Sequence, residues 1–132
     1  PRVMTEPVSV LDLVPAVTEH LGFAPHGNFQ GRADILSPGY RAQGRPLLLT
    51  IQGLTQEDAI LRDDWKLLLN RDRRERALFD LATDPQERRN LAATEPARLA
   101  ELERQLDLLL RDQLAYYRER GWESGWYPPK LP

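Results

Sequence analysis

Few side chains in this sequence are of the types that act as nucleophiles, metal ligands or acid–base groups, and none of them has the spacing of a known catalytic motif. Cysteine is absent, which excludes disulfides, thiolate metal sites and cysteine nucleophiles from the chain. The two histidines are His20, beside Leu21 on a predicted helix, and His26, in a loop rich in glycine and proline. A metal site on them would need a third ligand, which no spacing indicates. We therefore predict no catalytic residue, metal ligand or cofactor site within the chain.

Acidic and basic side chains gather around the predicted hairpins. Adjacent acids occur at Glu57-Asp58 and Asp63-Asp64, but neighbours on a strand point to opposite faces, so neither pair is expected to form a carboxylate dyad. Residues 71–76, RDRRER, alternate arginines with acids. This turn is either a rim that attracts an anionic substrate or a solvated hairpin tip with weak local ion pairs, and we favour the second interpretation.

Composition narrows the classes of function. Apolar residues make up 41% and charged residues 29% of the 132 residues, which suits one folded domain of ordinary size. The formal net charge of −2 argues against a nucleic-acid partner, because neutralising phosphates needs a cationic excess. No run approaches the roughly 18 apolar residues that a membrane span needs. The chain does not begin with methionine, so we expect a piece of a longer protein, whose compartment these residues do not reveal.

The elements that position these residues indicate an α+β fold. Residues 8–22 carry a helical stripe of Val10, Val14, Val17 and Leu21, capped by Ser9 or by Asp12 and ended by Gly22. Residues 23–46 form a loop rich in glycine and proline. Four antiparallel strands are predicted at 46–52, 57–63, 65–71 and 75–81. A long helix follows from a cap at Thr94 to Gly121, and its stripe of Leu99, Leu102, Leu106 and Leu109 should cover one face of the sheet.

A short helix is predicted just after the last strand. Asp84 and Glu87 have the spacing of a capping box, Pro85 suits the first helical position, and Asn90 can stop the helix after about two turns. The motif of Asp80, Asp84, Pro85, Glu87 and Asn90 is therefore interpreted as structural rather than catalytic.

The order of motifs resembles the sulfatase family, within the alkaline-phosphatase-like superfamily. A lysine opens an apolar strand at Lys66, and LFDLATDPQERRNLA (78–92) is similar to the family's L-Y-D-L-x-x-D-P-x-E-x-x-N-L-A, with Phe79 where Tyr is usual. VSVLDLVPAVTEHLG (8–22) resembles V-S-x-x-D-I-x-P-T, with Ala16 where Thr is usual, and GRADIL (31–36) is a looser match to G-x-S-L-x-P. The resemblance implies that residues 1–45 end a sulfatase core and that 46–132 form a C-terminal sheet-and-helix subdomain.

The resemblance also implies that the catalytic parts lie elsewhere in a parent protein. Family members cleave sulfate esters with a formylglycine, made from Cys or Ser in C/S-x-P-x-R, and with a divalent metal, usually calcium. Ser9, Ser37 and Ser124 are not followed by x-P-x-R, and Asp12 matches an acid of the family's helix rather than of its metal site. The chain alone should be inactive, should complete the fold of an upstream catalytic core, and should border its substrate cleft. His26, Arg73 and Arg74 are the candidate residues for a substrate rim, and the resemblance itself assigns none of them this role. The parent's compartment stays open among periplasm, cell exterior and membrane attachment.

Other interpretations stay open at this point. The chain could be a self-standing protein-interaction domain, or part of a related phosphate or phosphonate ester hydrolase with a different upstream nucleophile. Trp122, Trp126 and Tyr127 could stack on a sugar, but such a tail more often seals an interface. PLLLTIQ (46–52) and WKLLL (65–69) are too continuously apolar for strands with one wet face, so the uncovered face of the sheet should bind a partner or self-associate.

Overall fold

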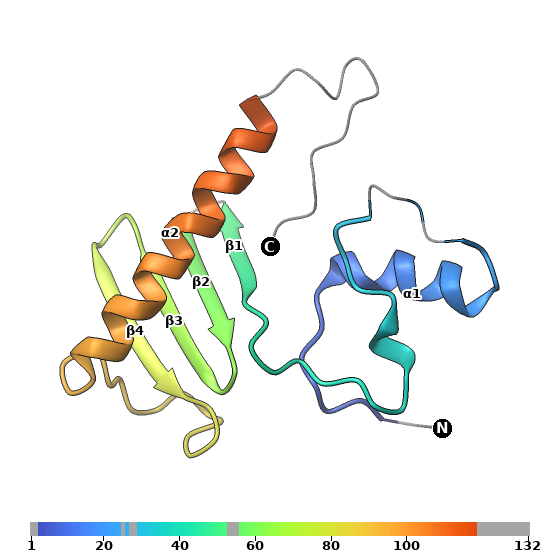
Figure 1. Cartoon of the computed structure of the whole chain (residues 1–132). Coiled ribbons are helices and arrows are strands. Elements are labelled where there is room, and N and C mark those ends of the chain that lie inside the picture. The colour runs from blue at the N-terminus through green and yellow to red at the C-terminus, as the bar shows by residue number, and fades with distance from the viewer. Residues whose placement is uncertain (1–2, 25, 27–28, 53–55, 119–132) are drawn as a thin grey trace. The chain divides into compact units, whose positions relative to one another are not determined.

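The structure is a computed structural model of the whole chain, and it describes residues 3–24, 26, 29–52 and 56–118. The chain forms two compact units (Figure 1). The sheet unit comprises Gln43–Arg111, and the N-terminal unit combines Pro1–Ala42 with Asp112–Pro132. The division predicted between residues 45 and 46, with the first part ending a sulfatase core, stays a prediction.

The sheet unit confirms the four predicted antiparallel strands. They are β1 (Leu47–Gln52), β2 (Gln56–Arg62), β3 (Trp65–Asn70) and β4 (Glu75–Asp80), and they lie in the order β1-β2-β3-β4. The predicted hairpin at Asp63-Asp64 is also present, since Arg62 pairs with Trp65 across it. Asp63 adopts a φ of 53°, and aspartate tolerates this left-handed conformation better than most residues.

Helix α2 (Pro96–Arg118) lies across one face of this sheet (Figure 1). Leu102 and Leu106, from the predicted stripe, are buried there. They pack with one buried residue from each of the strands β2, β3 and β4, namely Ile60, Leu67 and Leu78. The cap predicted at Thr94 is one residue early, because α2 begins at Pro96 and the Thr94 hydroxyl donates to the Leu91 carbonyl at 3.2 Å instead of capping the helix. Gly121 lies outside the described residues.

The register shows which side chains occupy the other face of the sheet. Leu49 pairs with Ala59, which pairs with Leu68, which pairs with Ala77, so these four share the face opposite Ile60. Leu47, Ile51, Leu61 and Phe79 lie on this face as well. None of these residues belongs to the core under α2, and Leu49 and Ile51 are 45% and 58% exposed. The apolar residues of this face are joined by Glu57, Lys66, Asn70 and Glu75, so the face is only partly apolar, and its binding of a partner stays a prediction.

The N-terminal unit answers the question of which residue caps the first helix. Ser9 caps a 3-10 turn, η1 (Val10–Asp12), and the helix α1 (Leu13–His20) continues directly from it. Ser9 and Asp12 form a capping box, while Pro15 falls in the first turn of α1, where its missing N–H disturbs no helical hydrogen bond. Gly22 follows the helix with a φ of 79°, as expected for the residue after a helix end.

The core of the N-terminal unit is small, and most of its residues come from the loop rich in glycine and proline, residues 23–46. Ala16 of α1 packs with Ile35 of the 3-10 helix η2 (Asp34–Leu36), with Tyr40 and with Ala42. The large apolar residues of the predicted stripe on α1 point away from this core and are exposed. Among the described residues, no helix is long and apolar enough to cross a membrane.

Candidate functional site

The three residues predicted to line a substrate rim are surface residues. His26 belongs to the N-terminal unit, where its ring lies 5.8 Å from the ring of Phe29, centroid to centroid. Arg73 and Arg74 lie in the turn between β3 and β4, in the sheet unit, and both are exposed. The structure therefore presents two separate candidates, one in each unit, and the rim role of the three residues stays a prediction.

The turn between β3 and β4 is held by its polar neighbours. The Asp72 carboxylate accepts from the Gln56 N–H at 2.9 Å, and the Asn70 side chain accepts from the Arg73 N–H at 2.9 Å. Arg71 forms an ion pair with Asp58, whose side chain is only 8% exposed. Among the residues that the structure describes, these contacts leave the Arg73 and Arg74 guanidinium groups without a carboxylate partner. They are therefore cations available to an anion in solution.

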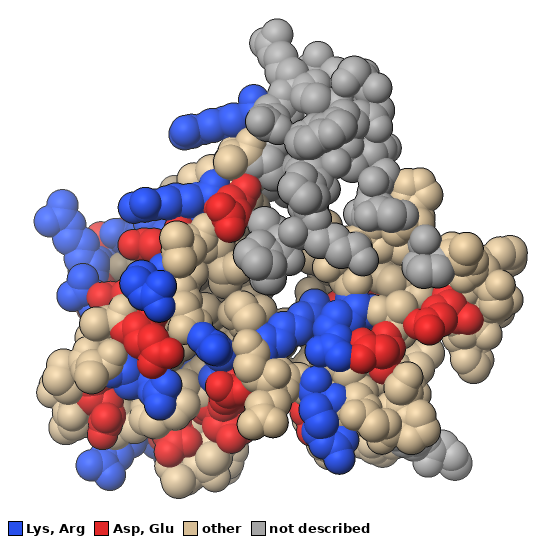
Figure 2. Space-filling view, viewed as in Figure 1, with Lys and Arg blue, Asp and Glu red and all other residues tan. Residues whose placement is uncertain are grey.

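Elsewhere on the sheet unit, positive and negative side chains are interspersed (Figure 2). The face shown carries no broad region of a single sign among its described residues. Of the two acid pairs, Glu57-Asp58 has separate partners: Glu57 accepts from the Asn70 side chain at 2.9 Å, while Asp58 pairs with Arg71 on the opposite face. Two carboxylates on opposite faces of a strand cannot share a proton or a metal ion.

The segment after β4 corrects the prediction of a short capped helix. Residues 81–92 form turns and bends instead. The Asp84 carboxylate accepts from the Arg89 N–H at 2.8 Å rather than from Glu87, and Glu87 adopts a φ of 54°, which a right-handed helix cannot contain. Asp80 holds the preceding turn, because its carboxylate accepts from the Ala82 N–H at 3.1 Å.

Glu87 turns away from the helix geometry because it forms an ion pair with the sheet. Both of its carboxylate oxygens accept from the Lys66 ammonium group, at 2.7 and 2.8 Å. The two side chains are 22% and 33% exposed, so the contact is partly shielded from water. Lys66 lies on the sheet face opposite α2, since it pairs with Leu61 and Phe79. The contact thus ties the segment after β4 to that face.

Asn90 closes the outer edge of β4. Its side-chain oxygen accepts from the Leu78 N–H at 3.0 Å, and its side-chain amide donates to the Arg76 carbonyl at 3.0 Å. The next residue continues this pairing, because the Leu91 N–H donates to the Leu78 carbonyl at 2.8 Å. These are backbone groups that an edge strand would otherwise leave open to pairing with another chain. Asn90 therefore blocks the edge instead of ending a helix.

We expect the substitution Asn90→Ala to lower the free energy of unfolding of the chain by about 2 kcal/mol, because it leaves the backbone groups of Leu78 and Arg76 without protein partners. Urea unfolding followed by far-UV circular dichroism measures this change. Asn90→Asp should recover only part of the loss, since it places an oxygen against the Arg76 carbonyl. Gln86→Ala, at an exposed position of the same segment, is the control and should change little. An equal effect of Gln86→Ala and Asn90→Ala would contradict the edge role.

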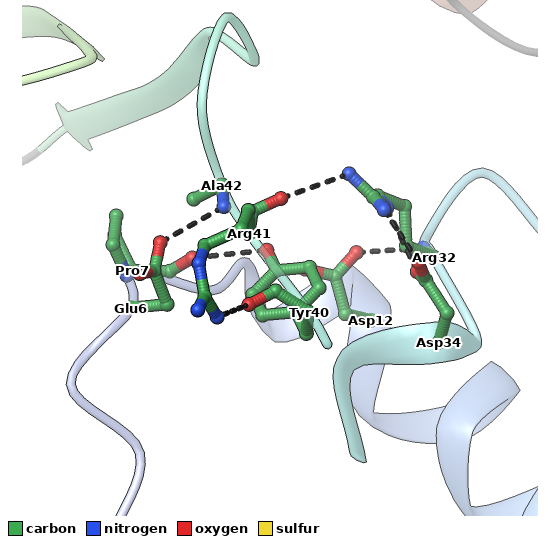
Figure 3. A network of polar contacts seen from close by, with 8 residues as sticks. All are labelled: Glu6, Pro7, Asp12, Arg32, Asp34, Tyr40, Arg41 and Ala42. Atoms are coloured by element: carbon green, nitrogen blue, oxygen red, sulfur yellow. Dashed lines mark hydrogen bonds and ion pairs between the residues drawn. The ribbon is translucent and has the colours of Figure 1, made fainter. Parts of the chain in front are cut away.

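A second cluster of polar contacts lies in the N-terminal unit and is shown in Figure 3. Its centre is Asp12, which is fully buried. One carboxylate oxygen of Asp12 accepts from the Ser9 N–H at 2.8 Å, and the other accepts from the Arg32 N–H at 2.8 Å. The side chain thereby joins the start of α1 to a residue twenty positions later in the chain. Asp12 acts as a clamp that fixes the loop against the helix.

The Arg32 side chain extends the cluster. Its guanidinium group pairs with the Asp34 carboxylate at 2.5 Å and lies 5.0 Å from the centre of the Tyr40 ring. The hydrogen bond to Asp34 raises the pKa of Arg32 above its ordinary value. The Tyr40 hydroxyl donates to the Pro7 carbonyl at 3.1 Å, and the Glu6 carboxylate accepts from the Ala42 N–H at 2.9 Å (Figure 3). Both contacts bind the segment before η1 to the end of the loop.

This cluster has the chemistry of a structural network rather than of a reaction centre. Its carboxylates accept from backbone N–H groups or from a guanidinium group, as expected of side chains that hold a fold together. Across the described residues, no group of three or more potential ligands could hold a metal ion. The potential ligands among the described residues therefore do not fit a calcium site, and a chain without cysteine and without Ser-x-Pro-x-Arg does not fit a formylglycine precursor.

Comparison with known proteins identifies the fold. No protein-family model and no curated protein sequence matches the chain. Solved structures do. A candidate sulfatase from Bacteroides thetaiotaomicron superposes with a TM-score of 0.65 at 22% identity, over 81% of this chain and 25% of its own. A 2-O GAG sulfatase gives a TM-score of 0.64 at 22% identity, over 81% of this chain and 25% of its own. This is the fold of the sulfatase C-terminal region.

The similarity extends to a structure determined with a bound oligosaccharide. Ps i-CgsB, in complex with k-i-k-neocarrahexaose, has a TM-score of 0.66 at 21% identity, over 79% of this chain and 24% of its own. The chain thus spans about a quarter of the length of the proteins it matches.

Proposed function

We propose that this chain is the C-terminal, non-catalytic portion of a hydrolase of sulfate esters. In this proposal it completes the fold of an upstream catalytic core and borders the substrate cleft of that core. The observation that carries the proposal is the unequal coverage: the likeness spans 79% of this chain but 24% of a matched chain. A segment that forms one quarter of a larger fold most simply functions within such a fold.

The chemistry of the reaction would come from the upstream region. A divalent metal and a formylglycine, when present there, would supply the Lewis acid and the nucleophile for cleavage of the sulfate ester. The described residues of this chain offer no ligand set for the metal, and the sequence contains no precursor of the formylglycine, so in this proposal the chain contributes by packing and by shaping the edge of the cleft.

The substrate class that we propose is an anionic, sulfated saccharide. The structures that this chain resembles include one solved with D-glucosamine-2-N,6-O-disulfate and one described as a 2-O GAG sulfatase. Arg73 and Arg74 are exposed cations in a turn whose backbone is held by neighbouring side chains. Guanidinium groups bind sulfate-like oxygens through paired N–H donors, which suits a rim that attracts such a substrate. His26 is the third rim candidate, from the other unit.

Two alternatives use the same fold differently. A related hydrolase of phosphate or phosphonate esters would carry another upstream nucleophile. A self-standing interaction domain would have no upstream catalytic region at all and would bind a protein through the apolar face of its sheet. The upstream sequence of the gene distinguishes the three, because only the sulfatase requires C/S-x-P-x-R.

The direct experiment compares this chain with the full-length protein encoded by its gene. Aryl sulfate and aryl phosphate are supplied with and without calcium. We expect no turnover from the 132-residue chain and calcium-dependent hydrolysis of the sulfate ester by the full-length protein. Replacing Arg73 and Arg74 together with alanine should raise KM for a sulfated oligosaccharide by about fivefold and leave kcat unchanged, as expected for a rim that only attracts substrate.

The control for the rim is Arg88→Ala, which removes another exposed arginine of the same unit and should leave KM unchanged. Equal effects of the control and of the rim variant would reduce the rim to a general charge effect. Preference for the phosphate ester would favour the related hydrolase, and a full-length protein without activity on either ester would overturn the proposed function.

A further inference from the structure

Helix α2 carries a row of three arginines on the side that faces away from the sheet. Arg104, Arg111 and Arg118 follow one another at intervals of seven residues, which is close to two helical turns, so they lie in one line along the helix. Leu102 and Leu106 are buried under the sheet, and position 104 lies about 160° around the helix from each of them. All three arginines are exposed. We call these three residues the arginine row.

The arginine row has no acidic partners within the part of the chain that the structure describes. Nearby arginines of the sheet unit do form ion pairs, and these are Arg62, Arg71, Arg76 and Arg98. The ion pairs of Arg62, Arg76 and Arg98 are made with acids of α2 itself, namely Glu101 and Glu103. The helix therefore uses these two acids for pairing and leaves the guanidinium groups of the arginine row open to a ligand.

One acid lies beside the arginine row. Asp107 is exposed, three residues after Arg104 and four before Arg111, which are spacings at which side chains of a helix can meet. Among the described residues, however, Asp107 forms no ion pair with either arginine. Its charge lowers the positive potential along the row without occupying a guanidinium group. Removing this charge should therefore strengthen the binding of an anion.

The spacing of the arginine row favours a long ligand over a small anion. Seven residues of helix span about 10.5 Å, so the row extends over about 21 Å. A single anion contacts one guanidinium group, and an ion pair open to water contributes at most about 1 kcal/mol. A chain with anionic groups at intervals can contact two or three arginines at once, and linked contacts bind far more tightly than separate ones.

We infer that the arginine row binds an extended sulfated polysaccharide. The ligand class rests on the proposed function, in which the substrate is an anionic, sulfated saccharide. The planar guanidinium group suits sulfate, because two of its N–H groups can donate to two oxygens at once. Leu108 and Leu114 lie beside the row and are 48% and 53% exposed, and they offer apolar surface to the C–H groups of sugar rings.

The packing of α2 separates this ligand from an anionic membrane. A helix that lies in a membrane interface inserts its apolar stripe among the lipids and keeps its basic residues at the headgroups. In α2 the apolar stripe is already buried, because Leu102 and Leu106 pack with Ile60, Leu67 and Leu78 of the sheet. The helix has no second stripe to insert, so its arginines suit a ligand that binds at the surface.

Binding of heparin oligosaccharides tests the inference. The dissociation constant, Kd, of a heparin octasaccharide is measured by calorimetry at two salt concentrations, for the 132-residue chain and for the full-length protein. The test variant is the double substitution Arg104→Ala and Arg111→Ala, since alanine preserves the helix. The matched control is Arg88→Ala with Arg89→Ala, which removes the same charge from two exposed arginines of the same unit. A third variant, Asp107→Asn, removes the acid beside the row.

We expect the test variant to raise Kd by about tenfold, because two of the linked contacts are lost. Its Kd should also depend less steeply on salt, because fewer counterions are released on binding. The matched control should change Kd by less than about twofold, and Asp107→Asn should lower Kd by about threefold, because it removes a repulsion. A gain in affinity cannot result from misfolding, so Asp107→Asn keeps the test valid even if the double variant is less stable.

An unchanged Kd in the test variant of a full-length protein that hydrolyses sulfate esters would overturn the inference and leave the proposed function standing. The expected changes in Kd, found in a full-length protein without such activity, would keep the sulfated ligand of the arginine row and overturn the proposed function. Equal weakening by the matched control would overturn the inference, because it would reduce the row to a general charge effect. Tighter binding to duplex DNA or to anionic vesicles, with the same dependence on the row, would overturn it as well.

Discussion

Replacing Gly31 with alanine should destabilise the N-terminal unit by about 3 kcal/mol, at the upper end of what overpacking costs. A Cβ atom at this position would lie 1.9 Å from the Leu11 carbonyl oxygen and 2.7 Å from the Asp12 nitrogen. Both are backbone atoms, so no side-chain rotation can relieve the clash. The backbone cannot retreat either, because the next residue, Arg32, donates its N–H to the buried Asp12 carboxylate at 2.8 Å.

Hydrogen exchange resolved by segment measures this effect separately in the two units. In Gly31→Ala, amides of residues 8–22 should exchange about a hundredfold faster, which is the factor that corresponds to a loss near 3 kcal/mol. Amides of β2 and β3 should keep their wild-type rates. Gly39→Ala is the matched control, because a Cβ there meets nothing within 4 Å and the residue has no positive φ. Similar exchange in both variants would mean that the close approach of Gly31 and Leu11 contributes little.

The sheet unit was the part of the fold most open to prediction from sequence. Its strands are short apolar runs separated by polar turns, and its helix carries leucines at helical spacing, so local pattern and tertiary packing agree. Leu102 and Leu106 lie under the sheet because the stripe that predicts the helix is also the stripe that the sheet buries. Where local and global preferences coincide in this way, a sequence specifies its element types well.

The segment 84–90 shows where such prediction fails. Asp84, Pro85 and Glu87 carry every local signal of a capped helix, yet tertiary contacts at two distant points prevent it. Glu87 pairs with Lys66 of β3, and Asn90 pairs with the edge of β4. Glu87 reaches the sheet face opposite α2, while Asn90 reaches the edge strand, and these two long-range contacts outweigh the preference of a few residues for a helical turn. No pattern within the segment itself carries this information.

For the N-terminal unit, prediction from sequence failed for a different reason. The pattern of apolar residues predicted the helix but not which side of it is buried. The stripe of Val10, Val14, Val17 and Leu21 was found from spacing, while the structure buries the opposite side. The spacing of apolar residues indicates that one side of a helix is apolar, but it does not indicate which surface packs against that side. The loop residues that do form the core, among them Tyr40, lie in a stretch whose glycines and prolines hide them from pattern analysis.

Replacing Asp12 with asparagine should destabilise the N-terminal unit by about 3 kcal/mol, although the two side chains have nearly the same shape. Asp12 is fully buried and accepts one N–H on each carboxylate oxygen, from Ser9 and from Arg32. Asparagine keeps one acceptor and turns its amide toward the other N–H, so two donors face each other. An unsatisfied buried donor costs about 1–3 kcal/mol, and the loss of a charge-assisted hydrogen bond adds to it.

The surface pair beside it provides the control. Asp34→Asn weakens the contact with the Arg32 guanidinium group, but the Asp34 and Arg32 side chains are 49% and 38% exposed. Ion pairs this open to water contribute at most about 1 kcal/mol, so Asp34→Asn should change exchange in residues 8–22 only slightly.

The amide exchange rates of Asp12→Asn, compared with those of Asp34→Asn, decide the role of Asp12. If Asp12 is a buried clamp, Asp12→Asn should accelerate amide exchange in both segments that Asp12 joins, residues 8–22 and residues 29–42. Each segment would lose a contact with the Asp12 carboxylate. Exchange that rises only around the helix would reduce Asp12 to an ordinary capping residue, whose loss costs about 1 kcal/mol. Since the Arg32 N–H is the only one of the two contacts that crosses from helix to loop, the rate in residues 29–42 is the measurement that separates these cases.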